Sequence, residues 1–329
     1  MKCRSFCMVM YVWLIAMSCT KKYQTADPAG SGPASGGAQP ACSSQIIDVE
    51  SMQVFPATNP WHADISASEV DPNSTQILSK YAQTGLHPDF GSGLYQGSTI
   101  GFPFIVVCAN QARIPVVFRS NAYDGNYGDE SDPGPYPIPL NAPIEQSGDA
   151  HVLAIDKDNM KLYELYNANV NGTHWEASSG AVFDLTSNAY RPDGWTSADA
   201  AGLPVFAGLI RYDEVANGAI NHAVRFTLQK PYVLPAHILP ARHDVNSTGQ
   251  ANASLPFGAR LRLKAGFDIS SYPSKIQVIL KAFKKYGLIL ADIGSNMYIS
   301  GSVDERWDND ELSRLSNVKA SDFEVIKLN

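Results

Sequence analysis

Acidic, histidine and aromatic residues gather in a few short polar stretches of the chain. One stretch places Trp61, His62 and Asp64 close together, and another holds Asp193 and Trp195. Carboxyl and imidazole groups transfer protons in catalysis, and an indole ring offers a large flat surface with one polar edge. These stretches indicate loops that bind a ligand or act on one.

These stretches and their neighbours supply two sets of candidate site residues. The candidate catalytic groups are Asp64, His151, Asp193, Glu214 and His222. The candidate substrate-binding residues are Trp61, His62, Trp195, Arg211 and Tyr212. One shared pocket is predicted to hold four of the acids and histidines, namely Asp64, His151, Asp193 and His222.

Several of these residues also have a structural interpretation. Arg211 beside Glu214 would form an ion pair that stabilises the fold, and His222 next to apolar residues would be a hydrogen-bonded core histidine. A serine or aspartate before a helix commonly caps it, as Ser197 or Asp199 would. Both interpretations stay open on the sequence alone.

An acidic loop precedes a proline-rich run. Its carboxylates, Asp129, Glu130 and Asp132, repel one another unless water, a cationic side chain or a hard metal ion compensates them. Calcium takes several oxygen ligands, so this loop is the candidate metal site, with a solvated turn as the alternative. No cofactor is expected to be required, and His237 and His243 match no compact zinc template.

The leading hypothesis from these residues is a surface protein that handles carbohydrate, as a glycoside hydrolase or a polysaccharide lyase. A glycoside hydrolase needs two carboxyl groups at the scissile bond, whereas a lyase needs a base and a cation facing a uronate carboxylate. The rival hypothesis is a non-catalytic, lectin-like binding protein, and a structural envelope protein is a third. Two carboxyls that face one another in a cleft would favour the enzyme.

The charge and the motifs of the chain argue against several other classes of protein. The formal net charge is −7, 17% of residues are charged, and no run is rich in Lys or Arg. The electrostatic footprint of a nucleic-acid-binding protein is therefore missing. The chain also has no GxSxG elbow, phosphate-binding loop, HExxH helix or EF-hand loop.

The N-terminus has the pattern of a secretory signal. Lys2 and Arg4 precede an apolar run that is too short to span a bilayer, and small residues follow before Cys19. Residues 16–19 resemble a bacterial lipobox, which implies that Cys19 is lipidated and begins the mature chain. An ordinary signal peptide cut nearby is the alternative.

Composition divides the rest of the chain into a tether and a domain. Residues 20–41 are rich in Gly, Ser, Ala and Pro and predict a disordered tether, while residues 42–329 predict a single β-rich globular domain. We expect an exported protein of the cell envelope, anchored to the outer membrane by its lipid or extracellular. In that compartment Cys42 and Cys108 would pair, or Cys108 would be a buried free thiol.

Short runs rich in β-branched and aromatic residues recur through the domain and predict strands. They are residues 104–108, 114–119, 151–156, 161–167, 181–185, 223–227, 259–264, 297–300 and 323–328. Helices are predicted over 74–81, 274–286 and 308–315, and in pieces over 197–215. The predicted fold is mainly β, a β-sandwich or jelly-roll-like domain with a few peripheral helices, with α+β as the alternative.

Some longer segments resemble those of a family of secreted bacterial proteins and lipoproteins. They read NPWHADIS, ESDPGPYPIP, GDAHVLAIDKD, DGWTSADAAGLPV and RYDEV. The resemblance covers nearly all of residues 54–327. It implies an exported, single-unit domain and brings no catalytic residues to transfer to this chain.

Overall fold

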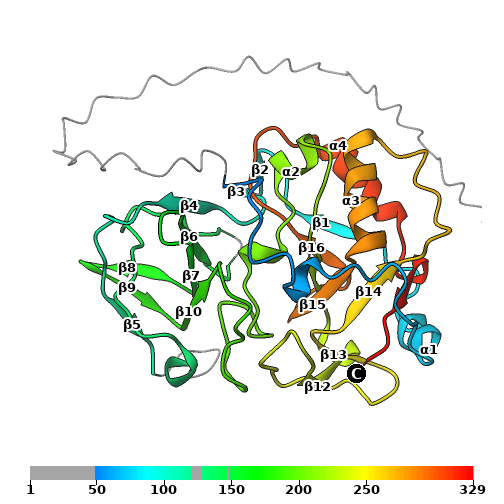
Figure 1. Cartoon of the computed structure of the whole chain (residues 1–329), viewed down its shortest axis with the longest axis horizontal. Coiled ribbons are helices and arrows are strands. Elements are labelled where there is room, and N and C mark those ends of the chain that lie inside the picture. Colours follow the sequence, from blue (N-terminus) through cyan, green and yellow to red (C-terminus); the bar gives the residue numbers. More distant parts are fainter. Residues whose placement is uncertain (1–48, 121–126, 147, 329) are drawn as a thin grey trace, which may run out of the picture. The chain divides into compact units, whose positions relative to one another are not determined.

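Strands dominate the part of the chain that the computed structural model describes, which is residues 49–120, 127–146 and 148–328. These residues belong to one compact unit, Pro40–Asn329, and their strands form several sheets with few helices (Figure 1). The mainly β fold class predicted from the sequence is confirmed. The predicted signal and tether, 1–19 and 20–41 with Cys19, lie outside the described residues.

The largest sheet has six strands in the order β1-β16-β11-β15-β14-β17. Their bounds, in that order, are His87–Asp89, Tyr298–Ser300, Val224–Leu228, Leu288–Ile293, Arg260–Leu263 and Phe323–Val325. The pairs β1/β16 and β11/β15 are parallel, and the other pairs are antiparallel. This sheet therefore joins segments that lie far apart in the sequence.

A second sheet has four strands in the order β10-β7-β6-β4. Their bounds are Ser179–Asp184, Lys161–Tyr166, Val152–Asp156 and Phe104–Val107. β6 and β7, which match the predicted strand runs 151–156 and 161–167, form an antiparallel hairpin. Leu153 and Ile155 of β6 pack into the larger hydrophobic core, while Val152 and Ala154 face a smaller one. Both faces of this sheet are covered, as a strand's period of two allows.

Three small sheets complete the strands of the described residues. The first consists of β5 (Val116–Phe118), β9 (His174–Ala177) and β8 (Asn169–Asn171), and its Trp175 belongs to the smaller core. The other two are the pairs β12 (Val233–His237) with β13 (Leu255–Phe257), and β2 (Leu94–Tyr95) with β3 (Ser98–Thr99).

Helices in the described residues are few and mostly short. The α-helices are α1 (Ser74–Ser79), α2 (Tyr212–Ala216), α3 (Ser274–Lys285) and α4 (Asn309–Ser313). The 3-10 helices span Pro60–His62, Gly128–Glu130, Phe206–Gly208, Lys230–Tyr232, Arg314–Asn317 and Ala320–Asp322. Within the described ranges, none of the helices has the length and apolar character that a membrane span requires.

The helix α3 follows its sequence pattern. Ile276, Ile279, Leu280 and Phe283 are buried, and the helix packs against β14 (Figure 1). Gly287 follows the helix with φ +73°, and a Cβ there would lie 2.3 Å from the carbonyl oxygen of Leu261. Glycine adopts this conformation without strain, so the chain turns directly from α3 into β15.

The segment 197–215 is less helical than predicted. Residues 197–205 form an irregular loop, and helix appears only in Phe206–Gly208 and α2. The buried carboxylate of Glu164, on β7, accepts the N–H groups of Val205 and Phe206 at 2.9 Å each. These two N–H groups lie at the start of the 3-10 helix Phe206–Gly208, where they have no partner within the helix, so Glu164 fixes the end of the loop against β7.

Cys108 is disulfide-bonded rather than a free thiol. It directly follows β4, in the four-stranded sheet. Cys42, its predicted partner, lies outside the described residues.

Candidate functional site

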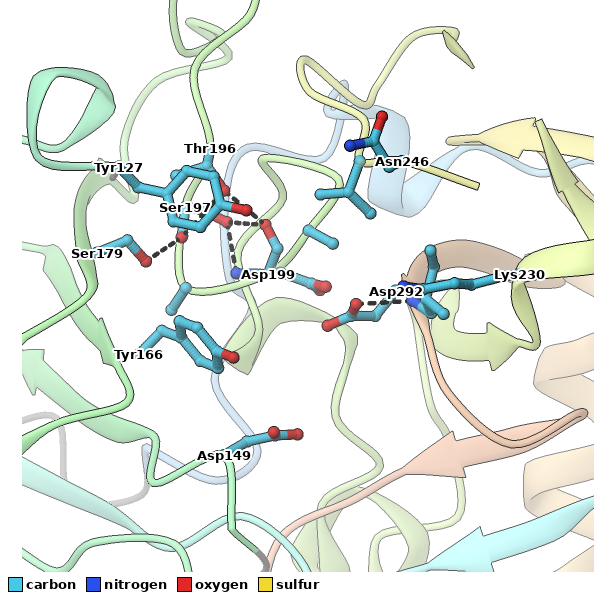
Figure 2. A pocket seen from close by; sticks show the side chains of 14 residues that line it. Tyr127, Asp149, Tyr166, Ser179, Thr196, Ser197, Asp199, Lys230, Asn246 and Asp292 are labelled. Atoms are coloured by element: carbon cyan, nitrogen blue, oxygen red, sulfur yellow. Dashed lines mark hydrogen bonds between the residues drawn. The ribbon is translucent and has the colours of Figure 1, made fainter. Parts of the chain in front are cut away.

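A cavity of about 640 Å³ lies where β7 and β15 end against the loop 196–200. Its polar lining residues are Tyr127, Asp149, Tyr166, Ser179, Thr196, Ser197, Asp199, Lys230, Asn246 and Asp292. Figure 2 shows the carboxyl groups of Asp149, Asp199 and Asp292 around one space, with the Tyr166 hydroxyl directed into it. The volume is that of a small-molecule site, and the lining suits a polar ligand.

A bulge near the end of β15 aims Asp292 at this cavity. Phe226 of β11 pairs with Leu290, but the next residue, Thr227, pairs with Asp292, so Ala291 is the extra residue. The carbonyl of Ala291 accepts the N–H of Ala201 at 3.0 Å, which ties the strand to the cavity loop. Bulges commonly redirect a side chain beside a functional site.

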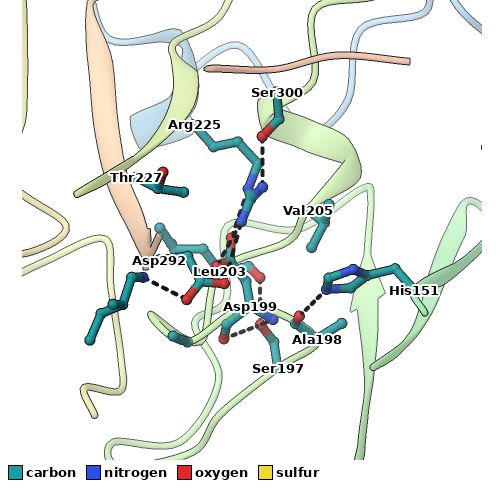
Figure 3. A network of polar contacts seen from close by, with 12 residues as sticks. His151, Ser197, Ala198, Asp199, Leu203, Val205, Arg225, Thr227, Asp292 and Ser300 are labelled. Carbon is teal, nitrogen blue, oxygen red and sulfur yellow. Dashed lines mark hydrogen bonds and ion pairs between the residues drawn. The ribbon is translucent and has the colours of Figure 1, made fainter. Parts of the chain in front are cut away.

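Arg225, from β11, links two carboxyl groups at the cavity (Figure 3). Its guanidinium nitrogens lie 3.0 and 3.1 Å from the two oxygens of Asp199 and 3.7 Å from Asp292 Oδ2. It also donates to Ser300 Oγ at 2.7 Å. Two acids therefore share one cation.

This charge balance favours a proton on Asp292. Burial raises the pKa of Asp292 to about 8, and the negative charges of Asp199 and Asp149 add to the increase. The charge of Arg225 and the N–H of Ile293 oppose that increase without cancelling it. The Asp292 side chain is 27% exposed, so its proton is accessible from the cavity at neutral pH.

Asp199 is fixed by its own loop. Ser179 Oγ donates to the Ser197 carbonyl at 2.7 Å, and Ser197 Oγ accepts the N–H of Asp199 at 2.9 Å. The Asp199 side chain is fully buried against Arg225. It therefore acts on the cavity through charge, whereas Asp149 is exposed and can touch a ligand directly.

His151 lies behind the cavity wall. Its Nδ1 is 2.5 Å from a Glu145 carboxylate oxygen and its Nε2 is 2.8 Å from the Ala198 carbonyl (Figure 3). Burial lowers the pKa of His151, but the charge and hydrogen bond of Glu145 outweigh it and raise the pKa to about 9. Because both nitrogens face acceptors, the ring is a fixed cation that supports the loop rather than a proton acceptor.

Two other predicted catalytic acids lie on the surface, outside this cavity. Asp64 is exposed and accepts the N–H of Ser66 at 2.9 Å. Asp193 is exposed, and one of its oxygens lies 3.1 Å from His237 and 3.0 Å from Arg242. Water solvates both carboxylates, so neither has the environment of a tuned catalytic acid.

The remaining predicted catalytic groups form a buried cluster. His222 Nε2 lies 3.2 Å from Glu214, and Glu214 also pairs with the buried Arg211. None of these three lines the cavity. The structure thus does not bring Asp64, His151, Asp193 and His222 together in this cavity. The contacts of Arg211, Glu214 and His222 agree with their structural interpretation, an ion pair and a hydrogen-bonded core histidine.

The aromatic residues predicted to bind substrate do not share a surface. Trp61 is 3% exposed in the larger core, and the ring nitrogens of His62 contact the carbonyls of Asn221 and Val54 at 2.6 and 2.7 Å. Trp195 lies beside the Arg191 guanidinium, 5.7 Å from its ring centre. Tyr212 packs under Arg306 at 4.3 Å. These contacts hold the fold together and leave no shared face for a sugar.

Two carboxylates of the acidic loop contact other groups of the protein, and the third is exposed. Glu130 accepts the N–H of Thr196 at 3.2 Å, and Asp132 accepts the N–H of Val182 at 2.8 Å and pairs with Arg191, while Asp129 is exposed. No group of three or more His, Cys, Asp or Glu side chains within the described ranges is arranged to hold a metal ion.

Asp292 and Tyr166 are not among the site residues predicted from the sequence. Asp292 stands in the run LILADI, where a single aspartate follows four apolar residues. An isolated acid near the end of a buried strand is a usable signal, because burial of an unpaired carboxyl is costly. No family model, curated protein or solved structure matches the chain, so its resemblance to secreted bacterial proteins stays a prediction.

Proposed function

We propose that the cavity around Asp292 is the active site of a glycoside hydrolase. The observation that carries the proposal is the pair of carboxyls, Asp149 and Asp292, on one polar cavity with a pKa of about 8 at Asp292. Glycoside hydrolysis needs a protonated and an ionised carboxyl around one bond. A carboxyl whose environment keeps it protonated at neutral pH is suited to act as the general acid.

Asp292 is the general acid in this proposal. It holds its proton at neutral pH and gives it to the oxygen of the leaving sugar. Asp149 is exposed, so water solvates its carboxylate, and it serves as the base or nucleophile on the other side of the bond. Arg225 and Asp199 are positioning residues that set the charge around Asp292.

A carbohydrate fits the remaining lining. Tyr127, Tyr166 and Asn246 offer hydroxyl and amide groups along the cavity, and Lys230 adds an ammonium group. A sugar presents many hydroxyls, each of which can both donate and accept a hydrogen bond. The cavity's mixture of donors and acceptors matches that pattern.

The test is the release of new reducing ends from a panel of neutral and acidic polysaccharides. Asp292→Asn and Asp149→Asn are each expected to lower the rate by about 10²- to 10⁴-fold. The wild-type rate should fall above about pH 8, where Asp292 loses its proton. Asp193→Asn is the matched control and should keep the wild-type rate, because Asp193 lies outside the cavity.

Two outcomes would overturn the proposal. One is full activity in both cavity variants, which would place the chemistry elsewhere. The other is saturable binding of a polysaccharide without any new reducing ends, which would make this chain a lectin-like binding protein.

We infer from the sequence that the chain is exported and anchored by a lipid on Cys19. The disulfide at Cys108 supports export, because disulfides persist mainly in oxidising compartments. Labelled palmitate should enter the wild-type protein in bacterial cells and not the Cys19→Ala variant. Equal labelling of the two proteins would contradict a lipid anchor on Cys19.

A further inference from the structure

Arg260, on β14, is half-buried and has no acid partner among the described residues. Arg191, Arg211, Arg225 and Arg262 are buried, and each forms an ion pair with a carboxylate. Arg260 contacts only backbone carbonyls, those of Pro60 and Tyr286, and none of the described carboxylates pairs with it. A partly desolvated guanidinium without an anion is unfavourable, so an external anion would be stabilised there.

The strand register shows why Arg260 lacks a partner. Arg260 and Arg262 stand two residues apart on β14, so their side chains lie on the same face of the sheet. Across the β14/β17 ladder Arg262 faces Glu324 and binds it. One step further the ladder places Ile326 opposite Arg260, with the Ile326 N–H bonded to the Arg260 carbonyl at 2.9 Å. An aliphatic side chain thus occupies the position of the matching acid.

Arg260 and Ile326 both line a cavity of about 520 Å³. Leu239 and Leu328 add aliphatic surface to it, and its other basic side chains are His237 and Lys327. No acid is among its lining residues. His237 pairs with Asp193 and Asp244, and Lys327 pairs with Glu69, so Arg260 is the cation that remains uncompensated.

We propose that this second cavity binds a small carboxylate with a short apolar body. The carboxylate would lie against the Arg260 guanidinium, which has further N–H donors beyond those bound to Pro60 and Tyr286 and can grip a carboxylate at two points. The apolar body would cover Leu239, Ile326 and Leu328. The site is separate from the Asp292 cavity and shares no lining residue with it.

Calorimetric titration of the full chain with octanoate and with octylamine at equal ionic strength tests the proposal. Octanoate should bind in a saturable, one-to-one manner, and octylamine should not. Ile326→Glu supplies the missing acid opposite Arg260 and should weaken octanoate binding about tenfold or more. Ile326→Gln is the uncharged control of similar size and should bind octanoate about as well as the wild type.

Leu239→Glu provides a second route if Ile326→Glu fails to fold. Leu239 is 57% exposed, so a charge there is tolerated, and it should repel the carboxylate while Leu239→Gln does not. The proposal fails if octanoate does not bind the wild type or octylamine binds equally well. It also fails if the folded glutamate variants keep wild-type affinity.

Discussion

Two buried arginines organise charge clusters with opposite balances. Arg225 serves two acids, Asp199 and Asp292, at the edge of the 640 Å³ cavity. In the other cluster two basic side chains, Arg211 and His222, contact a single acid, Glu214. Both arginines are almost fully buried, at 3% and 1% exposure, so the numbers of acidic and basic side chains around each one distinguish the clusters.

The pKa values of the acids follow this balance. Burial alone raises the pKa of both Asp292 and Glu214. At Asp292 the charge of Asp199 adds to that effect, whereas at Glu214 the charges of Arg211 and His222 outweigh it and lower the pKa. One acid keeps an accessible proton and the other is a fixed anion inside the protein. A contact between a histidine and a glutamate is therefore weaker evidence of a catalytic site than a buried cluster in which the acids outnumber the cations.

Removal of Arg211 should give the largest loss of stability. Arg211→Met leaves Glu214 buried with His222 as its remaining side-chain partner, so the free energy of unfolding should fall by about 3–5 kcal/mol. Urea denaturation at pH 7 measures this loss. In the double variant Arg211→Met/Glu214→Leu no uncompensated carboxylate remains, and part of the stability should return. A double variant less stable than Arg211→Met would show that the charge is not the cause.

The stability that the Asp292 cluster contributes should instead depend on pH. The folded pKa of about 8 lies above the ordinary value of 3.8, so the folded state binds more protons between these values. The stabilisation is complete below about pH 4 and is lost as the pH rises through 8. Relative to Asp292→Asn, the wild type should lose up to about 1.4 kcal/mol of unfolding free energy per pH unit in this window.

Asp193→Asn serves as the control for this measurement. The hydrogen bond of His237, together with the charge of Arg242, lowers the pKa of Asp193 below its ordinary value of 3.8, so its contribution to stability is constant above about pH 4 and is lost only below that pH. Between pH 4 and pH 8 the curve of Asp193→Asn should therefore run parallel to that of the wild type. Urea unfolding at intervals from pH 4 to pH 8 compares the three proteins. Parallel pH curves for wild type and Asp292→Asn would contradict a proton held on Asp292.

The local sequence pattern predicts the helices and strands whose contacts lie close together in the sequence. The spacing of Ile276, Ile279 and Phe283 predicts the helix α3, and the runs 151–156 and 161–167 predict the strands β6 and β7. β15 was not predicted, because its run LILADI is covered on both faces and shows no alternation. Its place between β11 and β14 depends on pairing with distant segments, and so does the bulge that aims Asp292.

The same limit applies to the site residues. His151 has the chemistry of a catalytic base, but Glu145 and the Ala198 carbonyl, 47 residues away, convert it to a fixed cation. Trp61 has the chemistry of a stacking platform, but it is buried against Gly208, where an added Cβ would come within 2.9 Å of its ring. Residue type predicts what a side chain can do, and the distant partners decide whether it is free to do it.

His222→Gln should have the smallest effect of the three changes. The amide can still donate a hydrogen bond to Glu214, and Arg211 continues to compensate the carboxylate. We expect a loss of about 1–2 kcal/mol in urea denaturation at pH 7 and a rise in the pKa of Glu214, measured by NMR titration. A loss as large as that of Arg211→Met would mean that His222 is the main counter-charge of Glu214. The contrast with Asp292 would then depend on the protonation of a histidine and not on the number of permanent cations.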